Sequence, residues 1–121
     1  MEKILVVDDD DSIRLLYSEE FRDEGYEVYE AASGEQALEI LEKVALDLII
    51  LDIKMPEMGG IECLRHIKAK DPKLPVLLSS AYAEYKGDFA CWCSDEYLIK
   101  SSDLSDLKAA VKKHLKSKKS Q

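Results

Sequence analysis

The residues Leu48-Ile49-Ile50-Leu51-Asp52 form an unbroken apolar run that ends in a carboxylate. Four apolar residues in a row, two of them β-branched, favour a strand that is covered on both faces, as in a parallel sheet. The next segment, residues 53–60, contains a proline and two adjacent glycines and is therefore expected to be a loop. Asp52 then lies at the carboxyl end of a buried strand, where open α/β sheets bind their ligands.

Four other segments have the composition of strands. Ile4 to Val7 is a second apolar run that ends in acids, and residues 26–31 alternate in polarity, as an edge strand does. Pro75 to Ser80 and Glu96 to Ile99 are the remaining two.

Helical patterns separate these strands. In the first, Ile13, Tyr17 and Phe21 form an apolar row with Leu16 beside it, Asp10 or Asp11 can cap the start, and Gly25 ends it. Further patterns follow Ser33, span Ile61 to Ile67, and begin after Ser102 or Asp103; residues 83–94 have no clear period, and a short helix is expected there. Five strands alternating with five helices predict a doubly wound parallel sheet, (βα)5.

Length and charge limit the function. The 121 residues suit a single domain, with a core over about 3–115 and a polar, basic, frayed tail at 116–121. Residues 1–60 contain 17 acids against 5 bases, whereas residues 61–121 contain 8 acids against 12 bases. This balance argues against direct binding of nucleic acid.

The cysteines and the N-terminus indicate a cytoplasmic protein. Cys63, Cys91 and Cys93 are an odd number and lack the spacing of a zinc site, so small buried apolar side chains are the expected role. Neither a signal peptide nor a run of 18 apolar residues is present, and no membrane partner is expected.

Polar residues follow four of the predicted strands. They are Asp8 with Asp9, Asp52, Ser80 and Lys100. A doubly wound sheet brings these positions together, and three acids around one point suggest a hard divalent cation such as Mg²⁺. Asp52 could then act as a nucleophile that receives a phosphoryl group, with Lys100 neutralising phosphoryl oxygens and Ser80 donating a hydrogen bond.

These motifs resemble the receiver domain of bacterial two-component response regulators, and as a single domain the chain is similar to stand-alone phosphorelay and chemotaxis regulators. The resemblance covers residues 3–115 and implies a flavodoxin-like sheet with the strand order 2-1-3-4-5. It rests on Val7-Asp8-Asp9, Leu51 to Pro56 with Gly59-Gly60, Ser80-Ala81, and Tyr97 to Lys100. Four such motifs in order at strand ends are far more specific than any one of them.

The resemblance implies phosphoryl transfer to Asp52 from a histidine kinase or a histidine phosphotransferase, with signalling through contacts to an unidentified downstream protein. It implies Mg²⁺, with Mn²⁺ as the alternative ion, bound by Asp8 or Asp9, Asp52 and the backbone carbonyl of Lys54. Asp9 is the favoured direct ligand, with Asp8 holding metal-bound water. Ser80 and Tyr97 would form the switch. Lys54 and Tyr82 occupy positions that influence hydrolysis of the acyl phosphate. Such a protein is no enzyme in the ordinary sense, although it assists its own phosphorylation and slow autodephosphorylation, and it is expected to be a monomer or weak dimer.

Two departures from the family pattern stand out. Ser101 replaces the usual proline after the lysine, and residues 83–94 are about two short of the common length. A cis bond before a non-proline residue costs roughly 2.5–4 kcal/mol, so the Lys100–Ser101 bond is predicted to be trans, with Lys100 still able to reach Asp52.

Two other functions compete with the receiver assignment. A phosphatase of the haloacid dehalogenase type also uses a strand-end aspartate with Mg²⁺, but its D-x-D pattern would need an acid where this chain has Lys54. A pseudo-receiver, a binding module that never takes phosphate, would keep the fold without the chemistry. The presence of every acceptor residue argues against it.

Overall fold

The computed structural model describes residues 2–52, 60–80, 96–99 and 104–119. Nine elements lie in these ranges. Their order is β1 (Lys3–Val7), α1 (Asp11–Asp23), β2 (Glu27–Ala31), α2 (Gly34–Lys43), β3 (Leu48–Asp52), α3 (Gly60–Lys70), β4 (Val76–Ser80), β5 (Glu96–Ile99) and α4 (Ser105–Lys119). The helix expected within residues 83–94 and the Lys100–Ser101 bond lie outside the described residues.

The five strands form one parallel sheet in the order β2-β1-β3-β4-β5, which confirms the predicted fold. β1 and β3 are neighbours in the middle of the sheet, and β2 is an edge strand, as its alternating pattern predicted. Because all strands run in one direction, their carboxyl ends meet along one edge of the sheet. The residues that follow β1 and end β3 are thereby placed side by side.

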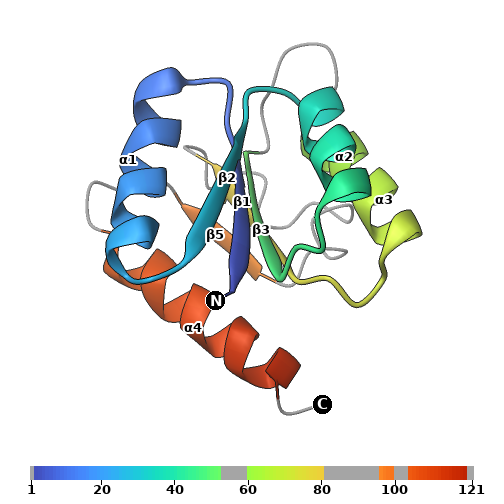
Figure 1. Ribbon diagram of the computed structural model, residues 1–121. Coiled ribbons are helices and arrows are strands. Elements are labelled where there is room, and N and C mark those ends of the chain that lie inside the picture. The colour runs from blue at the N-terminus through green and yellow to red at the C-terminus, as the bar shows by residue number, and fades with distance from the viewer. Residues whose placement is uncertain (1, 53–59, 81–95, 100–103, 120–121) are drawn as a thin grey trace.

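Helices cover both faces of the sheet (Figure 1). On one face, alternate side chains of β1 and β3 pack with Tyr17 and Phe21 of α1 and with the apolar face of α4, which includes Val111. On the other face, the intervening strand residues pack against α2 and α3, with Cys63, Leu64 and Ile67 fully buried. All five residues of β3 are buried, as expected for a strand covered twice.

Local signals set the ends of α1. The Asp10 side chain caps the helix by accepting hydrogen bonds from the backbone N–H groups of Ser12 and Ile13 at 2.9 and 3.2 Å. At the other end, Gly25 has a φ of +97°, which favours glycine because a side chain rarely tolerates it. Both the predicted cap and the predicted stop are therefore confirmed.

Two details differ from the sequence-based expectation. Leu16, which the pattern placed beside the buried row of α1, is 43% exposed, because the helix turns it away from Tyr17 and Phe21. The last helix continues through Lys119, so the segment from Lys116 to Lys119 is helical rather than a frayed tail.

α4 is also tied to α1 by charge. Lys108 lies 2.8 Å from Glu20 and 3.6 Å from Glu24, and these two carboxylates raise the pKa of Lys108. The first and last helices therefore share one surface of the molecule.

Candidate functional site

Three aspartates converge at the carboxyl ends of β1 and β3. Val7 pairs with Leu51 in the register of the two strands, so the next residues, Asp8 and Asp52, are neighbours across the sheet. Asp8 and Asp52 are 2% and 4% exposed, whereas Asp9 is open to solvent. One carboxylate oxygen from each of the three residues lies within 4.8 Å of the others.

Asp8 is fixed by its own backbone and by the start of α1. Its N–H donates to the Ala31 carbonyl at 3.1 Å, which continues the β1–β2 pairing one residue beyond the strand. Its Oδ1 accepts a hydrogen bond from the N–H of Asp10 at 2.9 Å. The carboxylate therefore points to the site with a defined orientation.

The three carboxylates suit a magnesium ion. Mg²⁺ prefers oxygen ligands at 2.0–2.1 Å, which places neighbouring ligand oxygens roughly 3 Å and opposite ones about 4 Å apart, and it usually keeps several waters. Carboxylate oxygens within 4.8 Å of one another can bind one such ion directly or through its waters. Without a cation, two buried acids and a third beside them repel one another.

The strand pairing gives the backbone positions of the two predicted switch residues, Ser80 and Tyr97. Ser80 ends β4, the strand next to β3, and Asp52 is paired in register with Ser79 just before it. Tyr97 lies in β5, paired with Leu78. The fold thus brings the position of Ser80 to the same edge as Asp52, and the roles given to the Ser80 and Tyr97 side chains stay predictions. Lys54, Tyr82 and Lys100 lie outside the described residues.

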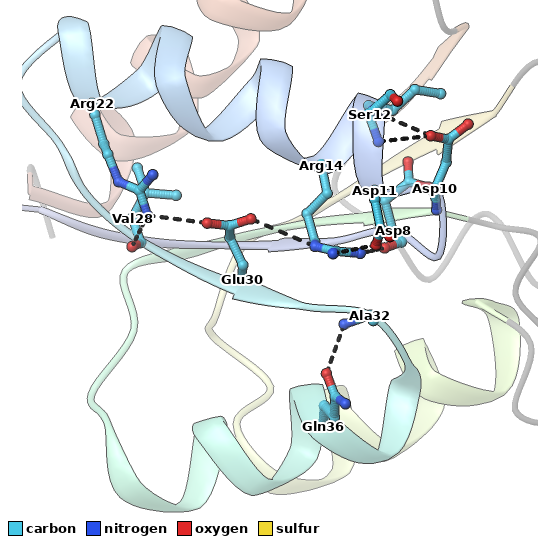
Figure 2. Close-up of polar contacts among 11 residues, drawn as sticks. Asp8, Asp10, Asp11, Ser12, Arg14, Arg22, Val28, Glu30, Ala32 and Gln36 are labelled. Carbon is cyan, nitrogen blue, oxygen red and sulfur yellow. Dashed lines mark hydrogen bonds and ion pairs between the residues drawn. The ribbon is translucent and has the colours of Figure 1, made fainter.

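Arg14 belongs to this site, and the sequence analysis did not identify it. Its Nη1 donates to the backbone carbonyl of Asp8 at 2.8 Å, its Nη2 pairs with Asp11, and its Nε lies 3.5 Å from Glu30 (Figure 2). The only signal in the sequence was a lone basic residue three positions after a run of four aspartates. Contact with Glu30 depends on how α1 packs beside β2, which no local pattern states.

Cys63, by contrast, has the structural role that was predicted. The thiol is fully buried, and its Sγ lies 3.9 Å from the Gly34 carbonyl. Burial raises the pKa of Cys63 to about 11, with a smaller effect from the charge of Glu35. A thiol with such a high pKa is neither a metal ligand nor a nucleophile near neutral pH.

The chain matches one protein family over most of its length. The profile of the response regulator receiver domain matches residues 4–112. Sporulation initiation phosphotransferase F of Bacillus subtilis is 41% identical over 118 residues, which cover 94% of both chains. The regulatory protein AtoC of Escherichia coli is 36% identical, with the match covering 93% of this chain and 25% of that protein.

Solved structures are similarly close. The response regulator protein TrrA of Thermotoga maritima, in complex with Mg²⁺-BeF, is 43% identical with a TM-score of 0.91, over 94% of this chain and 99% of that one. The complex of histidine kinase ThkA with TrrA gives a TM-score of 0.90, over 95% of this chain and 99% of the matched chain. The chain belongs to the response regulator receiver domain family, and it is a phosphoacceptor domain of two-component signalling rather than a haloacid dehalogenase phosphatase. None of the helices in the described ranges is long and apolar enough to cross a bilayer.

Proposed function

We propose that Asp52 receives the phosphoryl group. The observation that carries the proposal is a buried carboxylate at the end of the central strand β3, with oxygens of Asp8 and Asp9 within 4.8 Å. A carboxylate oxygen of Asp52 attacks the phosphorus of a phosphohistidine; the P–N bond breaks, a P–O bond forms, and the imidazole leaves with the electron pair and takes up a proton. The product is an acyl phosphate.

The surrounding residues would bind the ion, contact the phosphoryl oxygens and influence hydrolysis. Asp9 and Asp52, with the Lys54 carbonyl, would hold Mg²⁺ or Mn²⁺ directly, and Asp8 would orient its water. The bound ion supplies charge neutralisation for the transferring oxygens. Lys100 would neutralise a phosphoryl oxygen and Ser80 would donate a hydrogen bond to another, coupled to Tyr97, while Lys54 and Tyr82 would set the rate of slow autodephosphorylation. The phosphorylated domain would act by contact with a downstream protein.

Labelling with a small acyl phosphate tests the acceptor. Incubation with acetyl phosphate and Mg²⁺ should add one phosphoryl group, detected by intact mass and lost in hydroxylamine. Asp52→Asn removes the nucleophile and should abolish the addition. Asp106→Asn, an exposed aspartate of α4, is the matched control and should be labelled as wild type. Equal labelling of Asp52→Asn would refute the assignment, and absence of labelling in wild type would favour a pseudo-receiver.

The phosphodonor is proposed to be a histidine kinase or histidine phosphotransferase that docks beside α1. The large apolar residues exposed in the described part of the chain are Leu15 and Leu16, at 51% and 43%, and both lie in the first two turns of α1, which follows Asp8 and Asp9. Exposed leucines next to an acidic site suit an apolar protein surface better than a small molecule. The structure of TrrA with histidine kinase ThkA supports a partner of this class.

Substitution of Leu15 separates docking from chemistry. Leu15→Gln should slow transfer from a phosphorylated histidine protein by roughly tenfold, because removing a central apolar contact costs on the order of 1–2 kcal/mol. Labelling by acetyl phosphate should not change, since the site itself is intact. Glu39→Gln, on the exposed face of α2, should leave both rates unchanged. A parallel fall in both rates for Leu15→Gln would contradict the docking role.

A further inference from the structure

Arg14 joins three parts of the molecule through one guanidinium group. Its side chain is 17% exposed and contacts the Asp8 carbonyl, the Asp11 carboxylate and the Glu30 carboxylate (Figure 2). Glu30, on the edge strand β2, also accepts from Arg22 at 3.2 Å, and Arg22 donates to the Val28 carbonyl at 3.3 Å. Glu30 therefore holds Arg14 from the outer side while Asp8 lies on the inner side.

The carbonyl that Arg14 binds belongs to the peptide group between Asp8 and Asp9. On one side of it, the N–H of Asp8 is held by Ala31. On the other, Asp10 caps α1 and donates its N–H to the Asp8 carboxylate. The bound carbonyl orients the plane of this peptide group, which contains the Cα atoms of both Asp8 and Asp9. With the Asp8 N–H and the start of α1 held on either side, little backbone rotation is left at the two residues. Arg14 therefore restricts the backbone from which the Asp8 and Asp9 carboxylates extend beside Asp52.

We propose that Arg14 is a positioning residue for the metal site, holding the Asp8–Asp9 peptide so that both carboxylates face one ion. The proposal rests on the metal binding given under the proposed function. A planar guanidinium donates in several fixed directions at once, whereas a lysine ammonium is a single point charge and cannot hold Asp8, Asp11 and Glu30 together.

Arg14 could affect the site through its positive charge or by positioning the Asp8–Asp9 peptide. These two roles predict opposite changes in Mg²⁺ affinity when Arg14 is removed. The guanidinium is already neutralised by Asp11 and Glu30, so its loss would leave Asp11 without this partner and Glu30 paired with Arg22, which makes the surroundings of the site more negative. By charge alone, Mg²⁺ would then bind more tightly. If Arg14 acts by position, Mg²⁺ binds more weakly in spite of the added negative charge, so the sign of the change distinguishes the two roles.

The test is the dissociation constant for Mg²⁺, measured by titration calorimetry on the unphosphorylated protein. Arg14→Gln should weaken binding by roughly tenfold, at the lower end of what outer-shell substitutions cause. Arg14→Lys keeps the charge and should weaken binding as well. Arg22→Gln loses a contact with the same Glu30 but touches neither aspartate, and its dissociation constant should stay close to wild type.

Melting in Mg²⁺-free buffer accompanies each titration, so that a general loss of stability is recognised separately from weaker ion binding. If Arg14→Gln does not fold, Arg14→Lys decides. Wild-type or tighter binding in the folded Arg14 variants would overturn the positioning role alone. Absence of Mg²⁺ binding in wild type would overturn the metal site together with it.

Discussion

Cys63 shows how burial determines the chemistry of a single residue. The thiol lies in the core between the sheet and α3, and its pKa is raised to about 11 because the thiolate would be desolvated there. The unfolded chain has an ordinary cysteine, with a pKa of about 8.5. Below that value the thiol is neutral in both states, so the stability that burial gives is fully present.

As pH rises from about 8.5 toward 11, the thiolate forms in the unfolded chain first, and the stability is lost. We expect wild type to lose stability between pH 7.5 and pH 10 relative to Cys63→Ala, which has no thiol to ionise. Urea unfolding of both proteins at the two pH values measures this difference. In the native protein at pH 8, iodoacetamide should modify Cys63 far more slowly than in urea, as peptide mass spectrometry would show. A pH-independent difference in stability between the two proteins would contradict the argument.

At the scale of elements, the turn after α1 is a complete Schellman motif. The N–H of Gly25 donates to the Arg22 carbonyl at 3.0 Å, and the N–H of Tyr26 donates to the Phe21 carbonyl at 3.1 Å. The apolar contact that accompanies this motif is present, because the rings of Phe21 and Tyr26 lie with centroids 6.1 Å apart. The sequence pattern correctly predicted that Gly25 ends the helix, but it predicted that the next strand begins at Tyr26. The strand begins at Glu27, since the turn uses the Tyr26 N–H.

Substitution of Gly25 isolates the backbone part of this turn. A Cβ atom at Gly25 would meet nothing within 4 Å, so the cost of Gly25→Ala comes from the φ of +97° and not from a clash. We expect a loss of about 1 kcal/mol in the free energy of unfolding. Gly25→Asn should cost less, because asparagine tolerates positive φ better. Urea unfolding tests both, and equal stability of Gly25→Ala and wild type would contradict the strain argument.

At the scale of the whole molecule, the proposed magnesium site of the three aspartates would couple ion binding to folding. The three carboxylates of that site come together only when the sheet has brought Asp8 and Asp9 next to Asp52. At ten times its dissociation constant, a ligand selective for the native state adds about 1.4 kcal/mol to stability. Thermal melts in calcium-free buffer at constant ionic strength should show this increase with Mg²⁺, and Asp9→Ala should show a smaller one. Identical increments in both proteins would argue against Asp9 as a ligand.

Much of this architecture could be predicted from local patterns. The apolar runs gave β3 and β5 their bounds, and the acids after β1 and at the end of β3 indicated the site, because strand direction and side-chain period follow from sequence. Arg14 could not be found in this way, since its contact with Glu30 joins two elements whose distance only packing determines. The burial of Leu16 was predicted wrongly for a related reason, because the spacing of apolar residues in a helix does not determine how much of its surface the sheet covers.

The middle position of β3 has a consequence for how a signal could leave the domain. β3 has a hydrogen-bonded strand on each side and a helical layer on each face, so its backbone amides can reach solvent only when the whole domain opens. Asp52 therefore ends a strand that is paired on both sides and buried along its whole length. We therefore expect a new charge at Asp52 to act first on the groups beside it, such as Asp8 and Asp9, and to leave its own strand in place.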